Sequence, residues 1–170
     1  MEFSYQAPEK KVETIETYKS WDLDKLMAYI EKQYHQEIKT DINGLIPPID
    51  KVVRVHGASH PHLPAVRNLF LQLVAELNEH IKKEETIFNL IDDIKVDDNI
   101  LNFELSSLAG NHLAFESVFE NISELTNQFT APEGACRTYN LVYDLLRAFN
   151  EKLSHYREIE HDVLFEKIKK

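Results

Sequence analysis

Apolar side chains recur along most of the chain at alternating steps of three and four residues, the spacing of a helix that buries one face. The clearest run lies in the middle of the sequence and comprises Val66, Phe70, Leu73, Leu77, His80, Glu84, Ile87 and Ile91. Two neighbouring members of this run, His80 and Glu84, are polar. A buried carboxylate must be protonated, hydrogen-bonded or bound to a cation, so these two positions require an explanation.

The same periodicity divides the chain into four long helices. We expect them at about 22–57, 64–94, 100–128 and 134–168, the first with Asp22 as its N-cap and a kink or short break at Pro47 and Pro48. The connections "GASHPHLP", "KVDDN" and "TAPEGAC" contain the Gly, Pro and Asp residues that end and begin helices. Long helices with short connections predict an all-α fold, an up-down-up-down antiparallel four-helix bundle. We assign residues 1–21 to a loosely ordered N-terminal arm and residues 22–170 to the bundle.

The other three predicted helices also place a polar residue on their apolar faces. These residues are His35 in the first helix, His112 in the third, and Glu160, with His155 nearby, in the last. With a rise of about 1.5 Å per residue, His35 lies level with His80, and Glu84 lies level with His112. A single histidine of this kind is more often a hydrogen-bonded core residue than a ligand. Four helices that do the same at one height favour a metal site.

The candidate ligands are His35, His80, Glu84, His112, His155 and Glu160. Imidazole is a good ligand for iron, and glutamates can bridge two cations and offset their charge. The bound metals would in turn explain how carboxylates are tolerated in a bundle core. This set contains no thiolate, which argues against an iron–sulfur cluster or a structural zinc at this position.

His56 fails the height criterion, because on one continuous helix it would lie about 31 Å from His35. With His60 and His62 it belongs to a histidine-rich turn, where a second metal site is a lesser alternative. Cys136 is the single cysteine, so an internal disulfide is excluded.

Net charge limits the partners further. The formal charge of −10 makes nucleic acid and anionic membranes poor partners. No run of about 18 apolar residues is present, and the polar N-terminus is typical of neither a signal peptide nor an anchor. We therefore expect a soluble, cytoplasmic protein, and the sequence leaves the oligomeric state open.

The chain resembles the hemerythrin-like domain of the di-iron iron–sulfur-cluster repair proteins over about residues 22–168. The matching stretches are "YHQ" at His35, "VVRVHGASHP", "HIKKEETIF" at His80 and Glu84, "NHLAFE" at His112, "APEGAC" and "IEHDVLF" at Glu160. The resemblance implies that His35, His80, His112 and a histidine of the last helix bind two iron ions. Glu84 and Glu160 would bridge them in an oxo- and carboxylate-bridged pair, with manganese or a mixed pair as alternatives.

The last helix departs from the family pattern. Family members usually place a histidine four residues before the final glutamate, and here that position is Tyr156. His155 is five residues before Glu160, and on a regular helix the two point about 140° apart. A π-bulge brings such a pair onto one face, and the oxygen-carrying hemerythrins use a five-residue separation on the corresponding helix. Three readings stay open: His155 as the ligand, Tyr156 as a ligand or near neighbour, and the loss of one metal.

The resemblance implies a non-haem di-iron protein of the oxidative and nitrosative stress response. Its activity would be repair of iron–sulfur clusters by iron donation, or handling of nitric oxide. A diatomic ligand (O2 or NO) and iron–sulfur proteins are the expected partners. The family commonly carries a preceding domain with a cysteine pair, which this sequence lacks; that difference bears on cluster repair and not on the metal site. The alternatives are an O2- or iron-binding or sensing protein without turnover, and a helical interaction module without metal.

Overall fold

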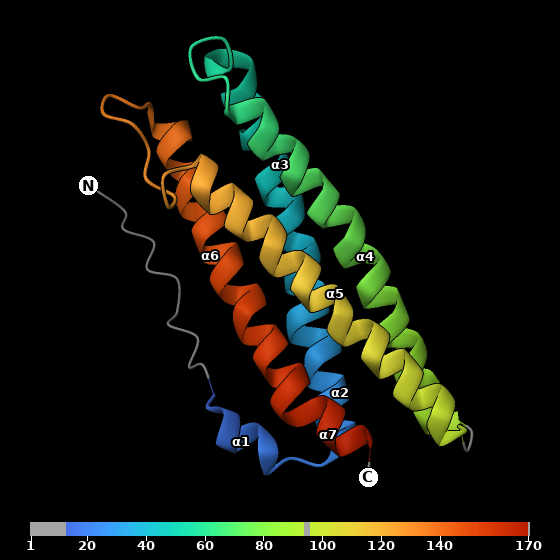
Figure 1. Cartoon of the computed structure of the whole chain (residues 1–170). Helices are drawn as coiled ribbons and strands as arrows, with labels where there is room; N and C mark the ends of the chain where they lie inside the picture. Colours follow the sequence, from blue (N-terminus) through green and yellow to red (C-terminus); the bar gives the residue numbers. More distant parts are fainter. Residues whose placement is uncertain (1–12, 94–95, 170) are drawn as a thin grey trace.

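The structure is a computed structural model that describes residues 13–93 and 96–169, and every regular element within them is helical. Four long helices form the bundle: α3 (Gln36–His56), α4 (Leu63–Asp93), α5 (Asp98–Leu125) and α6 (Arg137–Ile159). α4 packs along both α5 and α3, and α3 packs along α6. Successive helices run in opposite directions (Figure 1). The predicted all-α antiparallel bundle is confirmed.

Two of the long helices continue through short segments of π-helix. α2 (Leu23–Tyr29) leads through η1 (Ile30–His35) into α3, and α6 leads through η2 (Glu160–Leu164) into α7 (Phe165–Ile168). At the end of each π segment a backbone N–H donates to the carbonyl five residues earlier, from Gln36 to Glu31 and from Phe165 to Glu160. Such segments are found preferentially at functional sites. Here each one contains a candidate ligand, His35 in η1 and Glu160 in η2.

The apolar stripes identified in the sequence form the core. On α4 the side chains of Val66, Phe70, Leu73 and Leu77 are at most 2% exposed. Asp22 caps α2 as predicted, because its carboxylate accepts a hydrogen bond of 2.8 Å from the Lys25 N–H. Capping satisfies one of the N–H groups that the first turn of a helix leaves without a partner.

Of the kink or short break expected at Pro47 and Pro48, the break does not occur: α3 continues through both prolines. Proline removes the N–H that would bond to the carbonyl four residues earlier, here those of Asn43 and Gly44. Both of these residues are exposed, so solvent can satisfy their carbonyls. Leu45 and Ile49 flank the prolines and are at most 3% exposed, so their packing holds the helix in place.

Residues 13–21 are more ordered than the loose arm that we expected. They contain α1 (Ile15–Lys19), which contacts α6 and η2, and its Tyr18 is fully buried. α1 and α7 lie together at the same end of the molecule (Figure 1). The rest of the predicted arm, residues 1–12, lies outside the described residues. Within residues 13–93 and 96–169, none of the helices combines the length and the apolar character that a membrane span requires.

Candidate metal centre

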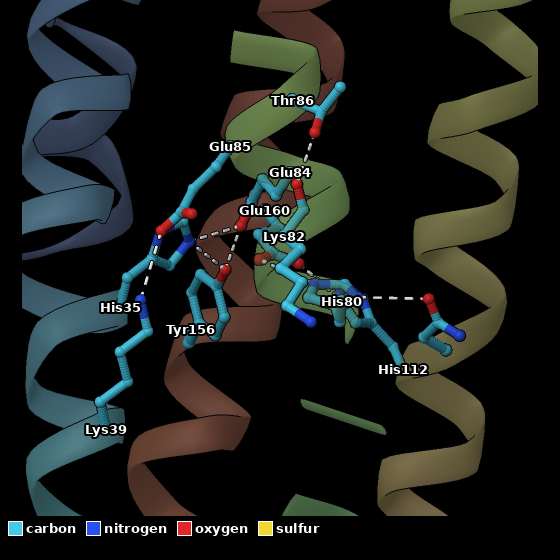
Figure 2. Close-up of polar contacts among 11 residues, drawn as sticks. His35, Lys39, His80, Lys82, Glu84, Glu85, Thr86, His112, Tyr156 and Glu160 are labelled. Carbon is cyan, nitrogen blue, oxygen red and sulfur yellow. Dashed lines mark hydrogen bonds and ion pairs between the residues drawn. The ribbon is translucent and has the colours of Figure 1, made fainter. Parts of the chain in front are cut away.

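Six polar side chains from all four helices of the bundle meet in its core. They are His35 from η1, His80 and Glu84 from α4, His112 from α5, Tyr156 from α6 and Glu160 from η2. All six are at most 4% exposed. Figure 2 shows the two carboxylates in the middle, with His35 and Tyr156 on one side and His80 and His112 on the other.

One half of the cluster is built around Glu84. Its Oε2 lies 2.8 Å from Nε2 of His35. The Tyr156 hydroxyl donates to the same carboxylate oxygen and lies 3.1 Å from Nε2 of His35. This half therefore has one imidazole, one carboxylate and one phenol.

The other half is built around Glu160. Its Oε1 lies 3.4 Å from Nε2 of His80, and its Oε2 contacts Nε2 of His112. The potential ligand atoms of His80, His112 and Glu160 all lie within 4.8 Å of one another. Two imidazoles and a carboxylate are thus already gathered as three donors around one point.

Polar groups outside the cluster lie beside two of the histidines. Nδ1 of His80 lies 3.4 Å from Oδ1 of Asn111, and Nδ1 of His35 lies 3.3 Å from Oε1 of Glu85 without the alignment of a hydrogen bond. A hydrogen-bond partner at Nδ1, as Asn111 is for His80, fixes the orientation of the ring with Nε2 toward the cluster. Lys39 in turn lies 3.6 Å from Glu85. These contacts are the outer layer that a metal-binding histidine ordinarily has.

Several buried polar atoms of the cluster lack a hydrogen-bond partner among the described residues. They include Oε1 of Glu84, Oε2 of Glu160 and Nε2 of His112, the last two in contact but not aligned for a hydrogen bond. An unsatisfied polar atom in a dry core costs free energy, and more so when it belongs to a charged group. A cation among these atoms would remove that cost. The nitrogen and oxygen donors present fit a first-row metal ion.

The electrostatics of the cluster follow from burial and from the proximity of the two carboxylates. Burial, together with the negative charge of Glu160, raises the pKa of Glu84 from 4.5 to about 7, against the opposing effect of His35. Burial would raise the pKa of Glu160 as well, but the charge of His80 and the contact with His112 outweigh it and lower that pKa. Burial lowers the pKa of His112 and raises the pKa of Tyr156 well above 10. Without metal, the cluster therefore holds a proton on Glu84 more readily than on Glu160.

The structure gathers five of the six predicted ligands and leaves His155 outside. The side chain of His155 is 25% exposed, and its Nδ1 lies 3.6 Å from Glu158. Its ring faces Tyr18 and Tyr34, with centroids 6.3 and 6.4 Å away. The π-bulge that would bring His155 onto the same face as Glu160 is absent, since the π segment begins at Glu160 and α6 is regular up to Ile159. Tyr156, four residues before Glu160, shares the inward face instead.

His56 lies away from this cluster, as its spacing predicted. It is the last residue of α3, and its Nε2 lies 3.2 Å from Sγ of Cys136 at the start of α6. His62 of the same turn lies 2.9 Å from the hydroxyl of Tyr143.

His161 is a neighbour of the cluster that the sequence did not single out. Its ring lies 4.9 Å from that of His112, centroid to centroid. Both histidines line a surface pocket of about 480 Å³ that also includes Arg157. Because His161 is adjacent to Glu160, it does not lie on the apolar face of the helix, and the spacing of apolar residues does not identify it. The pocket provides a route by which a small molecule can reach His112.

Comparison with known proteins gives a consistent result. Residues 26–168 match the family described as hemerythrin HHE cation binding domain. The iron-sulfur cluster repair protein ScdA of Staphylococcus haemolyticus (strain JCSC1435) is 30% identical over 151 residues, which cover 86% of this chain and 67% of ScdA. The iron-sulfur cluster repair protein YtfE of Yersinia pseudotuberculosis serotype IB is 28% identical over 169 residues, covering 97% of this chain and 74% of the relative. DnrN of Neisseria gonorrhoeae, also an iron-sulfur cluster repair protein, is 26% identical over 82% of this chain and 87% of its own. The fold, the buried His and Glu residues and the family match together show that this chain belongs to the hemerythrin HHE cation-binding family.

Proposed function

We propose that this chain holds a non-haem di-iron centre and serves in the oxidative and nitrosative stress response, where it donates iron to damaged iron–sulfur clusters. The observation that carries the proposal is the meeting of Glu84 and Glu160, each with its own histidine partners, in a core closed to solvent. Two carboxylates between two sets of imidazoles match the requirements of a pair of cations. The names of the relatives support the repair role.

His35, Glu84 and Tyr156 would face one ion, and His80, His112 and Glu160 the other. A bound iron pair supplies reversible one-electron chemistry and an affinity for diatomic molecules. Asn111 holds the ring of His80, Glu85 lies beside the ring of His35, and the packed core keeps bulk water out. Nitric oxide handling is the other activity that this site could support, and the pocket beside His112 and His161 gives a small molecule access.

The two halves differ in donor strength, and this difference suits iron donation. The half at Glu160 offers two imidazoles and a carboxylate. This carboxylate is already ionised in the metal-free protein, because the pKa of Glu160 is lowered. The half at Glu84 offers one imidazole, a carboxylate that must lose a proton near neutral pH, and a phenol that keeps its proton. Metal ligands must be deprotonated, so the ion beside Tyr156 is held less tightly. That ion is the cargo in this proposal, and the ion at Glu160 remains.

The first test is the metal content per chain of the protein as purified and after anaerobic iron loading. We expect two irons in the wild type, loss of iron in Glu84→Ala, and unchanged iron in the control His56→Ala, which alters a histidine outside the cluster. Two irons retained by Glu84→Ala would overturn the proposed site. Loss of iron in His56→Ala would show that the histidine-rich turn takes part in binding.

The second test addresses repair itself. An iron–sulfur dehydratase that has been inactivated by peroxide is mixed with the iron-loaded protein in the presence of an iron chelator. We expect recovery of dehydratase activity with the loaded wild type and none with the metal-free protein. Reversible oxygen uptake without any recovery would favour an oxygen-binding or sensing protein instead.

A further inference from the structure

A series of aromatic rings runs from the proposed metal centre to the surface. The ring of Tyr156 stacks on that of Tyr34, with centroids 5.1 Å apart and planes inclined by 12°. Tyr34 contacts Tyr29 at 6.0 Å, and Tyr29 contacts Trp21 at 5.1 Å. The series therefore begins at the residue whose hydroxyl donates to Glu84 and ends at the single tryptophan of the chain.

The outer rings line a pocket of about 600 Å³ where α1, α2 and η1 meet α6. Trp21, Tyr29 and Tyr34 all contribute to its wall. Tyr34 thus lines the pocket and also stacks on Tyr156. Among the described residues it is the only tyrosine or tryptophan whose ring contacts Tyr156, so any route through oxidisable rings must pass through it.

Two tyrosines of this series, Tyr156 and Tyr29, have polar partners at their hydroxyls that packing alone does not require. Tyr156 donates to Glu84, and the hydroxyls of Tyr18 and Tyr29 lie 3.1 Å apart beside the pocket. A phenol gives up an electron more easily when its proton can move at once to an acceptor, and Glu84, in its carboxylate form, supplies that acceptor for Tyr156. Phenylalanine would fill the same space but could not be oxidised in this way.

We propose that Tyr34 and Tyr156 form a relay that carries electrons, one at a time, from the surface pocket to the metal centre when an oxidant of the peroxide class reacts there. The role at the centre rests on the function proposed above. The electron path itself depends on the rings and on the carboxylate form of Glu84, not on the metal, and can be tested in the metal-free protein above pH 7.

Electrons and protons balance along this relay. Reduction of one hydrogen peroxide to two waters takes two electrons and two protons. For each electron, Tyr156 releases one electron toward the centre and its proton to Glu84. Tyr34 then returns an electron to Tyr156, which recovers its proton from Glu84, while Tyr34 loses its own proton to the solvent at the pocket. A one-electron donor of the ascorbate class at the pocket restores Tyr34 with an electron and a proton. Two such donors are oxidised for each peroxide, and the two protons that the peroxide takes up enter from solvent through the pocket beside His112, equal in number to the two that Tyr34 releases.

The single tryptophan allows a direct test on the whole chain without metal. A soluble ruthenium photo-oxidant removes one electron from Trp21 in a laser flash, and transient absorption follows the tryptophan radical. Electrons then move outward along the same rings, which tests the path in the direction opposite to that of the proposed relay. Lys25 lies 3.9 Å from the centre of this ring, and its positive charge disfavours a cation radical there, which promotes transfer to tyrosine. We expect rapid decay of the tryptophan signal with matching growth of a tyrosyl signal. A tryptophan radical that decays without any tyrosyl product in the wild type would overturn the relay.

Variants then locate the path. Tyr34→Phe keeps the ring stack and should prevent formation of the Tyr156 radical. Electron paramagnetic resonance identifies this radical as the signal that is missing in Tyr156→Phe. The radical should stop at Tyr29 or Tyr18. Tyr143→Phe is the matched control, because it alters a buried tyrosine that none of these rings contacts. A Tyr156 radical of undiminished yield in Tyr34→Phe would overturn the proposal, and circular dichroism confirms that each variant is folded.

The iron-loaded protein provides the second arm. Metal content is measured first, so that failure of the metal site is recognised separately from failure of the relay. After treatment with hydrogen peroxide, mass spectrometry maps oxidised residues. We expect oxidation at Trp21 and Tyr29 in the wild type and its loss in Tyr34→Phe at equal iron content. Equal oxidation of Trp21 in both proteins would show that the oxidant acts from solvent.

Discussion

Tyr156 contributes a phenol to the half of the centre around Glu84, where the other half has a second imidazole. Its hydroxyl donates to Glu84 and lies 3.1 Å from His35, so it occupies the space of a ligand. Burial, with the nearby carboxylates, raises its pKa well above 10, which keeps the phenol protonated in the metal-free protein, so it must lose a proton before it can bind a metal. The chemistry of one residue thereby sets the difference between the two halves.

In the proposed di-iron centre, Tyr156→His should therefore strengthen binding of the ion beside Glu84. An added imidazole donor is expected to raise that affinity at least about tenfold, since even outer-layer partners of ligands change metal affinity by this factor. The measurement is iron retained per chain after a timed challenge with a chelator. Retention no better than in the wild type would show that position 156 does not face the metal. His155→Ala is the matched control and should leave retention unchanged.

Glu84 gives the metal-free protein a distinct pH dependence. Its pKa rises from 4.5 to about 7 on folding, so its contribution to stability is full below pH 4.5 and is lost as the pH rises through 7. Glutamine does not ionise, so Glu84→Gln does not lose stability in this way as the pH rises. The variant should become more stable than the wild type by up to about 3 kcal/mol above pH 8, with little difference near pH 4.5. Urea unfolding of both metal-free proteins across this range gives the measurement.

Glu160→Gln should behave in the opposite sense. The pKa of Glu160 is lowered on folding, so its contribution is present above pH 4.5 and is lost as the pH falls. This variant should be less stable than the metal-free wild type at neutral pH. Parallel curves for the two glutamine variants would contradict the assignment of the shared proton to Glu84.

At the scale of elements, the sequence predicted the long helices of the bundle but not the short helix α1. Long stripes of apolar residues predicted the four bundle helices, because steps of three and four residues sustained over many turns are typical of a helix with one buried face. α1 has only five residues, too few for periodicity, and it is held by one buried side chain, Tyr18. The prolines of α3 carry a local preference for a break, but the buried Leu45 and Ile49 on either side override it.

The same reasoning separates the predicted site residues. His80, Glu84 and His112 stand on regular α-helix, where spacing alone determines the face. The choice between His155 and Tyr156 depended on where a π segment falls, and that is decided by backbone hydrogen bonds that leave no pattern in the sequence. The segment begins at Glu160, after both residues, so the regular four-residue spacing holds for Tyr156. The contacts of His161 and Glu85 come from packing between helices and were not predicted.

Tyr18→Ala tests whether α1 is part of the folded unit. Removing a fully buried aromatic ring should lower the free energy of unfolding by about 3–5 kcal/mol. Glu16→Ala, on the exposed face of α1, should change it by less than about 0.5 kcal/mol. Urea unfolding measures both. A cost below about 1 kcal/mol for Tyr18→Ala would mean that α1 does not pack on the bundle in solution.

At the scale of the whole molecule, the proposed centre couples metal binding to folding, because the proposed ligands come from all four bundle helices and converge only in the folded chain. A ligand that binds only the folded state raises the free energy of unfolding, by about 2.7 kcal/mol when its free concentration is a hundred times its dissociation constant. Anaerobic addition of ferrous iron should therefore raise the melting temperature, and a chelator should reverse the rise. Calorimetry measures both. The rise in melting temperature should vanish in Glu160→Gln and persist in His56→Ala. An equal rise in Glu160→Gln would place the stabilising ion elsewhere on this acidic chain, at surface carboxylates that need no assembled core.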